Sequence, residues 1–256
     1  MTAGRGGVGE RPAGRDAGAA AGVDKGPARI AAMFDAIARR YDLLNRVLSA
    51  GLDQRWRARA VRSLRLTGRE TVADFCTGTA DLAIALAGRR GGAARVVGID
   101  FAGEMLRHGL AKLRRSGLER RVALVRADAT QAPLADGAVD AATVAFGIRN
   151  VEQPQLALSE MHRLVRPGGR IAILEFGMPR LPVVGAAYGW YFRRVLPRLG
   201  SVVSGHGSAY AYLPASVGAF HGPEAFCRLL GEAGFRDARA VPLQMGIVYL
   251  YEAARA

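Results

Sequence analysis

Two acidic residues enclose a run of small residues in the first third of the chain. Asp74 ends a short apolar strand pattern, small residues occupy positions 76–80 after Phe75, and Asp81 lies near the start of an apolar helical pattern that we expect to begin at Thr79. A second apolar strand pattern further along ends in Asp100. Small side chains let the backbone approach a ligand, and an acid after the second strand can accept hydrogen bonds from ribose hydroxyls. These residue types predict a site for an adenine nucleoside.

The charges of this loop distinguish between two kinds of nucleoside. Dinucleotide folds carry G-x-G-x-x-G, so that a pyrophosphate can lie on a helix N-terminus. Here the loop keeps only Gly78, and Asp74 and Asp81 would repel a pyrophosphate. S-adenosylmethionine has a sulfonium, an ammonium and no phosphate, so the acids favour it. Loops of this kind also occur in purely structural roles, and the loop alone leaves that alternative open.

The apolar patterns predict an open, mostly parallel α/β sheet. The expected strands after the loop are Val96–Asp100, Val122–Ala127, Val139–Phe146 and Arg170–Phe176, and the expected helices include Gly103–Ser116, Pro154–Val165 and Pro223–Ala233. Two last strands, at about Ala238–Pro242 and Gly246–Ala253, lie too close together for a crossover helix, so they should form a hairpin whose last strand is antiparallel to the rest. The fold class is therefore α/β, with seven strands.

The chain also contains segments outside this alternation. Residues 1–27 are rich in Gly, Ala and Arg and are expected to form a disordered tail, followed by one domain at 28–256. Two helices within 28–66 should form a lid ahead of the sheet. An aromatic, proline-broken segment at about 178–222 is expected to be an inserted cap that selects the substrate.

Composition limits the partners. The 256 residues carry a formal net charge of +14, which suits nucleic acid or an anionic membrane surface. The basic residues are scattered, however, and nearly all are arginine, as a GC-rich genome would also produce. The two cysteines match no metal or redox spacing, and no histidine lies in a metal pattern, so we expect no metal and a reducing cytosol. The longest apolar run is shorter than the roughly twenty residues that span a bilayer.

Further polar residues follow the later strands. Asp128 lies after the third strand, where an open parallel sheet binds ligands, and could receive an adenine amino group. Arg149 and Asn150 follow the fourth strand at the same edge. They could line a substrate pocket or cap the sheet structurally. Tyr210 in the cap is a substrate candidate, although a packing role is equally compatible with the sequence.

Several stretches resemble the C-methyltransferases of menaquinone and ubiquinone biosynthesis, in register from about Met33 to the C-terminus. The resemblance is carried by the opening helix, by Asp74–Asp81, by Phe146–Val151, and by Arg163–Gly169 with Glu175. Three positions depart from the family's usual residues: Asp53 stands where histidine is usual, Gly177 where serine is usual, and Ala215 where glutamate is common. The last departure leaves room for an altered quinone or a specialised-metabolite substrate.

The resemblance implies a Rossmann-like class I methyltransferase fold and C-methylation of a demethylated polyprenyl quinol, most readily demethylmenaquinol. By resemblance, Gly78 and Thr79 bind the methionine part of S-adenosylmethionine, Asp100 binds the ribose, and Asp128 with Ala129 contacts the adenine. We expect Arg149 to stabilise a phenolate of the substrate, because a guanidinium is a permanent cation. A ubiquinone precursor, a phenolic metabolite, or a non-catalytic quinone- or lipid-binding role remains as an alternative.

A polyprenyl quinol resides in the bilayer, so we expect a cytoplasmic enzyme that binds peripherally to the inner face of the plasma membrane, with no nucleic-acid partner. Between Leu181 and Leu199, aromatic residues lie beside arginines, and they would suit anionic lipid headgroups. The sequence also allows a homo-oligomer.

Overall fold

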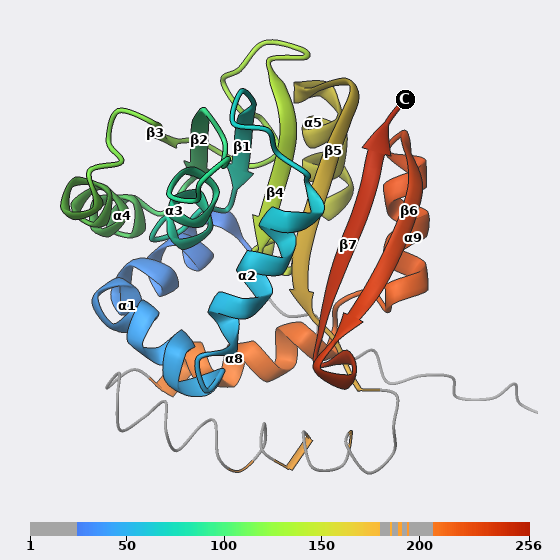
Figure 1. The fold of residues 1–256 in the computed structure, drawn as a ribbon. Coiled ribbons are helices and arrows are strands. Elements are labelled where there is room, and N and C mark those ends of the chain that lie inside the picture. The colour runs from blue at the N-terminus through green and yellow to red at the C-terminus, as the bar shows by residue number, and fades with distance from the viewer. Residues whose placement is uncertain (1–24, 180–184, 186–188, 191–193, 195–206) are drawn as a thin grey trace, which may run out of the picture.

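A seven-stranded sheet forms the centre of the part of the chain that this computed structural model describes, residues 25–179, 185, 189–190, 194 and 207–256. The strand order is β3-β2-β1-β4-β5-β7-β6 (Figure 1), and neighbouring strands are parallel except β7, which is antiparallel to both β5 and β6. The strands are β1 Thr71–Phe75, β2 Arg95–Asp100, β3 Val122–Arg126, β4 Val139–Ala145, β5 Val165–Phe176, β6 Phe235–Leu243 and β7 Val248–Arg255. The predicted α/β class, seven strands and closing hairpin are confirmed.

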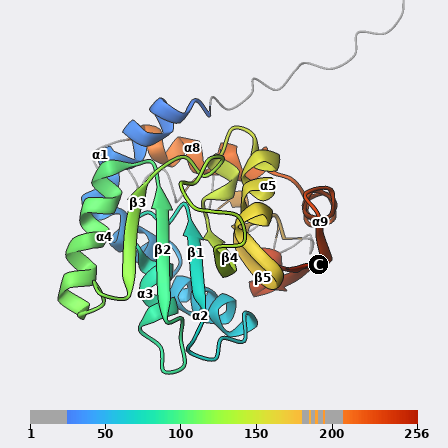
Figure 2. The ribbon, with the colours of Figure 1, turned by 90° about the horizontal axis from the view of Figure 1, so that it is seen from above.

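Helices cover both faces of the sheet and the edge at which the parallel strands end (Figures 1 and 2). One face shares a hydrophobic cluster with three helices, α2 Leu52–Ser63, α3 Asp81–Ala87 and α4 Gly103–Ser116. The other face packs against α5 Pro154–Leu164 and α9 Pro223–Glu232. Two further helices, α1 Pro27–Leu48 and α8 Gly207–Gly218, lie below the strand ends in Figure 1. The described chain also has two 3₁₀ turns, η1 Ile148–Asn150 and η3 Gln244–Gly246.

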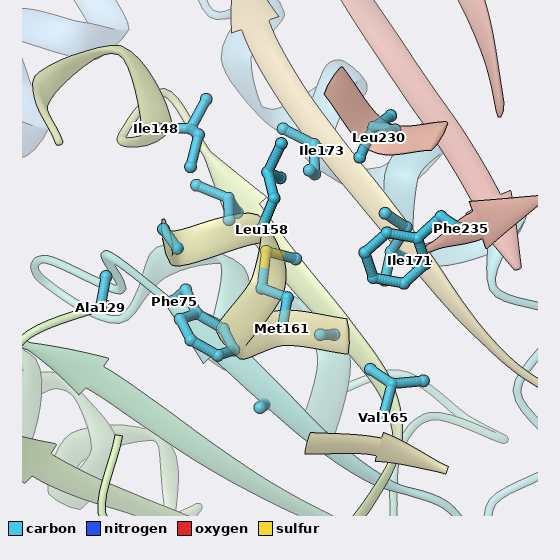
Figure 3. Packing of buried hydrophobic residues seen from close by; sticks show 14 of the residues in the cluster. Phe75, Ala129, Ile148, Leu158, Met161, Val165, Ile171, Ile173, Leu230 and Phe235 are labelled. Carbon is cyan, nitrogen blue, oxygen red and sulfur yellow. The ribbon is translucent and has the colours of Figure 1, made fainter. Parts of the chain in front are cut away.

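The sheet is held by cores on both of its faces, as β5 illustrates. Successive side chains of a strand point to opposite faces. Ile171 and Ile173 belong to the cluster with α5 and α9, part of which Figure 3 shows, whereas Ala172 and Leu174 belong to the cluster with α2 and α3. All four are almost fully buried, which is the pattern of a strand covered by helices on both faces.

Some element boundaries differ from the sequence predictions. The helix expected from Thr79 begins at Asp81, because Ala80 adopts a left-handed conformation with φ 64°. The strand expected from Arg170 begins at Val165, which pairs with Val139 before the register shifts within the Pro-Gly-Gly segment. Of the two helices expected to form a lid, only α1 lies at the strand ends, since α2 packs on a face of the sheet through its apolar side.

The order of the strands places a crevice between β1 and β4. The chain leaves β1 toward β2 and leaves β4 toward β5, so the loops after these two neighbouring strands diverge in opposite directions. In open α/β sheets, ligands bind at such a point, outside the carboxyl ends of the strands. The two loops approach closely there, because a Cβ at Gly147 would lie 2.3 Å from the Cβ of Cys76. A side chain at position 147 would therefore push the loops apart.

Several predictions lie outside the described residues. They concern the tail up to residue 24, most of the cap between residues 180 and 206, and most of the aromatic and basic segment from Leu181 to Leu199. Among the described helices, none combines the length and the apolar character needed to cross a membrane.

Candidate functional site

Two adjoining clefts lie at the crevice between β1 and β4. The first encloses about 410 Å³ of empty space, part of it open to solvent, and the second about 310 Å³. They share Tyr41, Cys76, Gly78 and Ala145 as wall residues. The first cleft also has Asp100 and Asn150 in its walls, and the second has Thr79. The structure therefore brings together four of the residues that the sequence singled out.

Asp100 lies at the end of β2 and is hydrogen-bonded to the loop at residues 76–80, between β1 and α3, which we call the cofactor loop. Its Oδ2 accepts a hydrogen bond from the Gly78 N–H at 2.8 Å, and its Oδ1 accepts one from the Ala102 N–H at 2.9 Å. Burial raises the pKa of this carboxyl group, against the effect of those two hydrogen bonds. A carboxylate can accept about four hydrogen bonds, so these two bonds leave acceptor capacity on the cleft side.

Asp74 is the most deeply buried acid of the loop. It is 1% exposed, and both oxygens accept hydrogen bonds from hydroxyl groups, those of Thr77 and Thr143, at 2.6 Å each. Burial raises its pKa to about 6, although the two hydroxyl groups act in the opposite direction. Near neutral pH this side chain can therefore change its charge when a ligand changes its surroundings.

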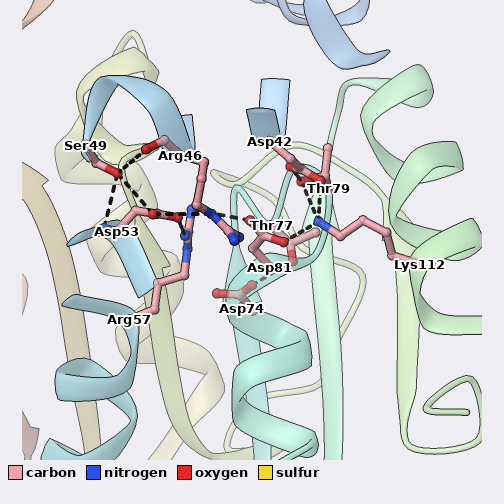
Figure 4. A network of polar contacts seen from close by, with 10 residues as sticks. All are labelled: Asp42, Arg46, Ser49, Asp53, Arg57, Asp74, Thr77, Thr79, Asp81 and Lys112. Atoms are coloured by element: carbon pink, nitrogen blue, oxygen red, sulfur yellow. Dashed lines mark hydrogen bonds and ion pairs between the residues drawn. The ribbon is translucent and has the colours of Figure 1, made fainter. Parts of the chain in front are cut away.

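Thr79 connects the cofactor loop with the first helix. Its hydroxyl donates to Asp42 Oδ1 of α1 at 2.5 Å and lies 3.2 Å from the ammonium group of Lys112. Lys112 also binds Asp42 Oδ2, at 2.7 Å, and Asp81 (Figure 4). The residue does not cap α3, because Ala80 holds the N-cap position. From the sequence, a threonine at this position could instead have been an N-cap, and the structure excludes that role.

Helix α1 closes the crevice from the side of the strand ends. Phe34 and Tyr41 line the first cleft and pack against Ala102 and Met105. At the same end of the helix, Asp35 Oδ1 accepts a hydrogen bond from the Glu104 N–H at 2.8 Å. Together with Asp42, these contacts fix α1 over the cofactor loop and over the start of α4.

The residues predicted to contact adenine lie apart from the two clefts. Asp128 follows β3, is exposed, and accepts hydrogen bonds from the backbone N–H and the hydroxyl of Thr130. Ala129 is buried in the core cluster with α5. Neither belongs to the walls of the two clefts. Tyr210 lies on α8, and its side chain is outside the described part of the chain.

Arg149 forms a buried ion pair instead of pointing free into a cleft. The side chain is 5% exposed, and its Nη1 lies 2.7 Å from Oε1 of Glu175, which is fully buried. The same nitrogen donates to the carbonyl oxygen of Phe146 at 2.5 Å, and Nε donates to the hydroxyl of Ser216 on α8 at 3.4 Å. Arg149 therefore joins β5, the loop after β4 and α8.

Asn150 brings an unused acceptor to the first cleft. The side chain is 8% exposed, and its Oδ1 is buried without a hydrogen-bond partner among the described residues. Its Nδ2 reaches the carbonyl oxygen of Phe146 at 3.5 Å. Buried polar atoms are nearly always hydrogen-bonded in proteins, so this oxygen fits a donor group of a ligand. Phe146 itself has φ 60°, which for a bulky residue is strained and typical of functional loops.

The residues of the clefts suit S-adenosylmethionine. Apolar and aromatic side chains, including Phe34, Phe101 and Met105, line the first cleft and can enclose a base. The second cleft holds the carboxyl groups of Asp74 and Asp81, which suit a ligand with a sulfonium and an ammonium. A pyrophosphate would meet these acids and would be repelled.

The sequence alone did not reveal the polar network around Thr79. Asp42, Arg57 and Lys112 come from three helices and meet only in the folded chain (Figure 4). One signal was available, because Lys112 is one of just two lysines in a chain that otherwise uses arginine.

The structure explains two of the three positions at which this chain differs from the family's usual residues. Asp53 forms an ion pair with Arg57, one helical turn later. At Gly177, a Cβ would lie 2.6 Å from the ring of Tyr249, so a serine does not fit beside that ring. Ala215 is exposed on α8.

The sequence matches known proteins over most of its length. Residues 23–255 match the model of the ubiE/COQ5 methyltransferase family. A ubiquinone/menaquinone biosynthesis C-methyltransferase UbiE of Geobacter sp. (strain M21) is 45% identical over 87% of this chain and 94% of its own. A demethylmenaquinone methyltransferase of Thermus thermophilus is 47% identical over 86% of this chain and 98% of its own.

Solved structures share the fold at low sequence identity. A SAM-dependent methyltransferase from Thermotoga maritima superposes with a TM-score of 0.58 at 17% identity, covering 88% of this chain and 100% of the other. One from Aquifex aeolicus gives 0.54 at 20% identity, covering 77% and 87%. These similarities identify the sheet and its helices as the class I methyltransferase fold.

Proposed function

The chain belongs to the ubiE/COQ5 methyltransferase family and is an S-adenosylmethionine-dependent C-methyltransferase, and we propose that it methylates a ring carbon of demethylmenaquinol. The observation that carries this choice of substrate is the 47% identity to a demethylmenaquinone methyltransferase over 98% of that protein's length. The crevice at the ends of β1 and β4 would hold both reactants.

Bound S-adenosylmethionine supplies an electrophilic methyl group on a sulfonium. The protein's task is then to hold the ring carbon in line with that methyl group, because proximity and alignment can supply most of the rate. We assign the cofactor to Gly78, Thr79 and Asp100, and to Asp128 with Ala129 if the loop after β3 folds over the adenine. Helix α1, fixed over the cleft by Asp42, would exclude water from this site.

Arg149 would act on the substrate through its charge. A ring carbon becomes nucleophilic when a neighbouring phenol ionises, and a nearby cation favours that ionisation. The first cleft already contains one phenol, the side chain of Tyr41, on which the charge of Arg149 acts. Burial raises the pKa of Tyr41, while a hydrogen bond with Asn45 and the charge of Arg149 act to lower it. A substrate phenol in the same cleft would feel the same charge, reduced by the partner Glu175.

Asn150 would orient the ring. Asn150 lines a cleft whose other walls are largely apolar, and its Oδ1 has no partner among the described residues, so a quinol hydroxyl would be a suitable donor for it. We also assign Tyr210 of α8 to substrate binding.

The enzyme would meet its substrate at an anionic membrane surface, because a polyprenyl quinol resides in the bilayer. Within the described part of the 181–199 segment, Trp190 is 60% exposed and Arg194 is exposed. An exposed tryptophan and an exposed arginine in the same segment suit the headgroup region of a bilayer.

The test is incubation of the purified protein with methyl-labelled S-adenosylmethionine and a short-tailed demethylmenaquinol, followed by mass analysis of the product ring. Label on the ring carbon is expected. Label on a phenolic oxygen, or a preference for a demethylated ubiquinone precursor supplied in competition, would contradict the proposed substrate.

A further inference from the structure

We propose that Arg57 of α2 binds the carboxylate of the methionine part of S-adenosylmethionine. The amino-acid end of this cofactor carries an ammonium and a carboxylate, and the carboxylate needs a cation in a site otherwise rich in acids. Among the described residues that line the second cleft, Arg57 is the one cationic side chain. It shares that cleft with Gly78 and Thr79 of the cofactor loop.

Arg57 is a buried guanidinium held in one orientation. The residue is 7% exposed, and its Nη1 donates to Oδ2 of Asp53 one helical turn earlier. Its Nη2 lies 3.6 Å from Oδ2 of Asp81, beyond hydrogen-bond distance. A guanidinium has five N–H donors, and the described residues show a hydrogen bond for only one of them. The group therefore keeps donors for a ligand.

Asp53 is not paired with Arg57 alone, because it also lies close to Arg46. Its Oδ1 accepts a hydrogen bond from the hydroxyl of Ser49 at 3.0 Å and lies 3.8 Å from Nε of Arg46. Arg46 thus adds a second positive charge beside Asp53 (Figure 4). The two arginines share the single charge of Asp53, while Asp81, 3.6 Å from Arg57, also pairs with Lys112.

Lys112 is the other cation near Thr79, but its donors are already used. An ammonium group has three N–H donors, and Lys112 directs them to Asp42, Asp81 and Thr79. It holds the loop and α1 together and is a positioning residue. A carboxylate arriving in the second cleft finds free donors on Arg57 and none on Lys112.

The test compares two ligands that differ only in the carboxylate. S-adenosylhomocysteine has it, and decarboxylated S-adenosylhomocysteine lacks it while keeping the ammonium. Titration calorimetry should show that Arg57→Met lowers the affinity for S-adenosylhomocysteine by about ten- to a hundredfold, the range for the loss of charge-assisted hydrogen bonds. The affinity of the decarboxylated ligand should stay unchanged. Arg59→Met, which removes an exposed arginine of the same helix, should leave both affinities unchanged.

Removing Arg57 alone leaves Asp53 buried without its partner and could unfold the protein. The double variant Asp53→Asn/Arg57→Met removes both charges and should reproduce the selective loss. Arg57→Lys keeps the positive charge but lacks the planar guanidinium with its paired N–H donors. It should therefore give a smaller loss of affinity, again only for the ligand that has the carboxylate. Equal weakening of the two ligands by Arg57→Met or by the double variant would overturn the proposal, as would a selective loss in Lys112→Met instead. Because binding is measured without an acceptor, the result is independent of the quinol proposed above.

Discussion

The guanidinium of Arg149 and the carboxylate of Glu175 lie 2.7 Å apart inside the protein, 5% and 0% exposed. Breaking a buried pair by removing one partner leaves an uncompensated charge and costs about 3–5 kcal/mol. We expect Arg149→Met to lower the free energy of unfolding in urea by about that amount. Arg149→Met/Glu175→Gln, which removes both charges, should lose less. Equal losses would show that the ion pair contributes little.

Turnover separates the catalytic role proposed for Arg149 from its role in stability. Variants that fold at low temperature, Arg149→Ala first, should lose turnover while binding S-adenosylhomocysteine with unchanged affinity, because Arg149 lines neither of the two clefts. The measurement is a single-turnover methylation assay beside calorimetry. Loss of both properties in equal measure would assign Arg149 a structural role only.

Asp74 should make the stability of the cofactor-free protein fall with rising pH. Its pKa is raised from 3.8 to about 6, so the folded protein holds a proton that the unfolded chain releases between those values. The stabilisation is fully present below pH 3.8 and is lost as pH rises through about 6, a change of about 3 kcal/mol. The free energy of unfolding in urea, measured from pH 4 to 7, should fall in the wild type relative to Asp74→Asn. Parallel curves would mean that Asp74 ionises normally.

Asp100→Ala should lower the affinity of the protein for the cofactor. The carboxylate would accept the ribose hydroxyls in charge-assisted bonds, and each lost bond is worth about 1.5–3 kcal/mol. The substitution also frees the N–H groups of Gly78 and Ala102, so the loop itself loosens. Calorimetry with S-adenosylhomocysteine measures the loss. An unchanged affinity would remove the basis for placing the ribose at Asp100.

Asp42→Ala should loosen the first helix. Asp42 joins α1 to Thr79 and Lys112, and local opening becomes easier when such tertiary contacts are removed. Hydrogen exchange followed by mass spectrometry should show faster exchange in Pro27–Leu48, with α5 as an unchanged internal reference. Exchange that is equally slow in α1 would mean that its apolar contacts alone fix it.

Binding to liposomes should rise with the content of anionic lipid and fall with salt. Each basic residue near such a surface contributes about 1 kcal/mol, so Arg193→Glu/Arg194→Glu should reduce co-sedimentation. Arg59→Glu/Arg62→Glu makes the same charge change on exposed residues of α2 and should have little effect. Sedimentation that responds to neither lipid charge nor the first variant would exclude this docking surface.

The sheet could be predicted from the sequence because its strands have short apolar patterns that end in acids or turn residues. Asp100 and Gly78 could be assigned to one site because parallel strands end at the same edge. The contacts of Arg57 with Asp81, and of Lys112 with Asp42 and Asp81, could not be predicted, since they join elements far apart in the chain. The ion pair of Arg149 with Glu175 of β5 could not be predicted either, because the two residues lie 26 positions apart in the chain.

The close approach of Gly177 to the ring of Tyr249 has an evolutionary consequence. Tyr249 of β7 pairs with Glu175 of β5, two residues before Gly177, and the ring occupies the volume of the side chain that Gly177 lacks. A family member that carries serine at the position of Gly177 must therefore have a smaller residue, or a displaced ring, at the position of Tyr249. Substitutions at these two sites should be inherited together, and an alignment of the family should show them as a correlated pair.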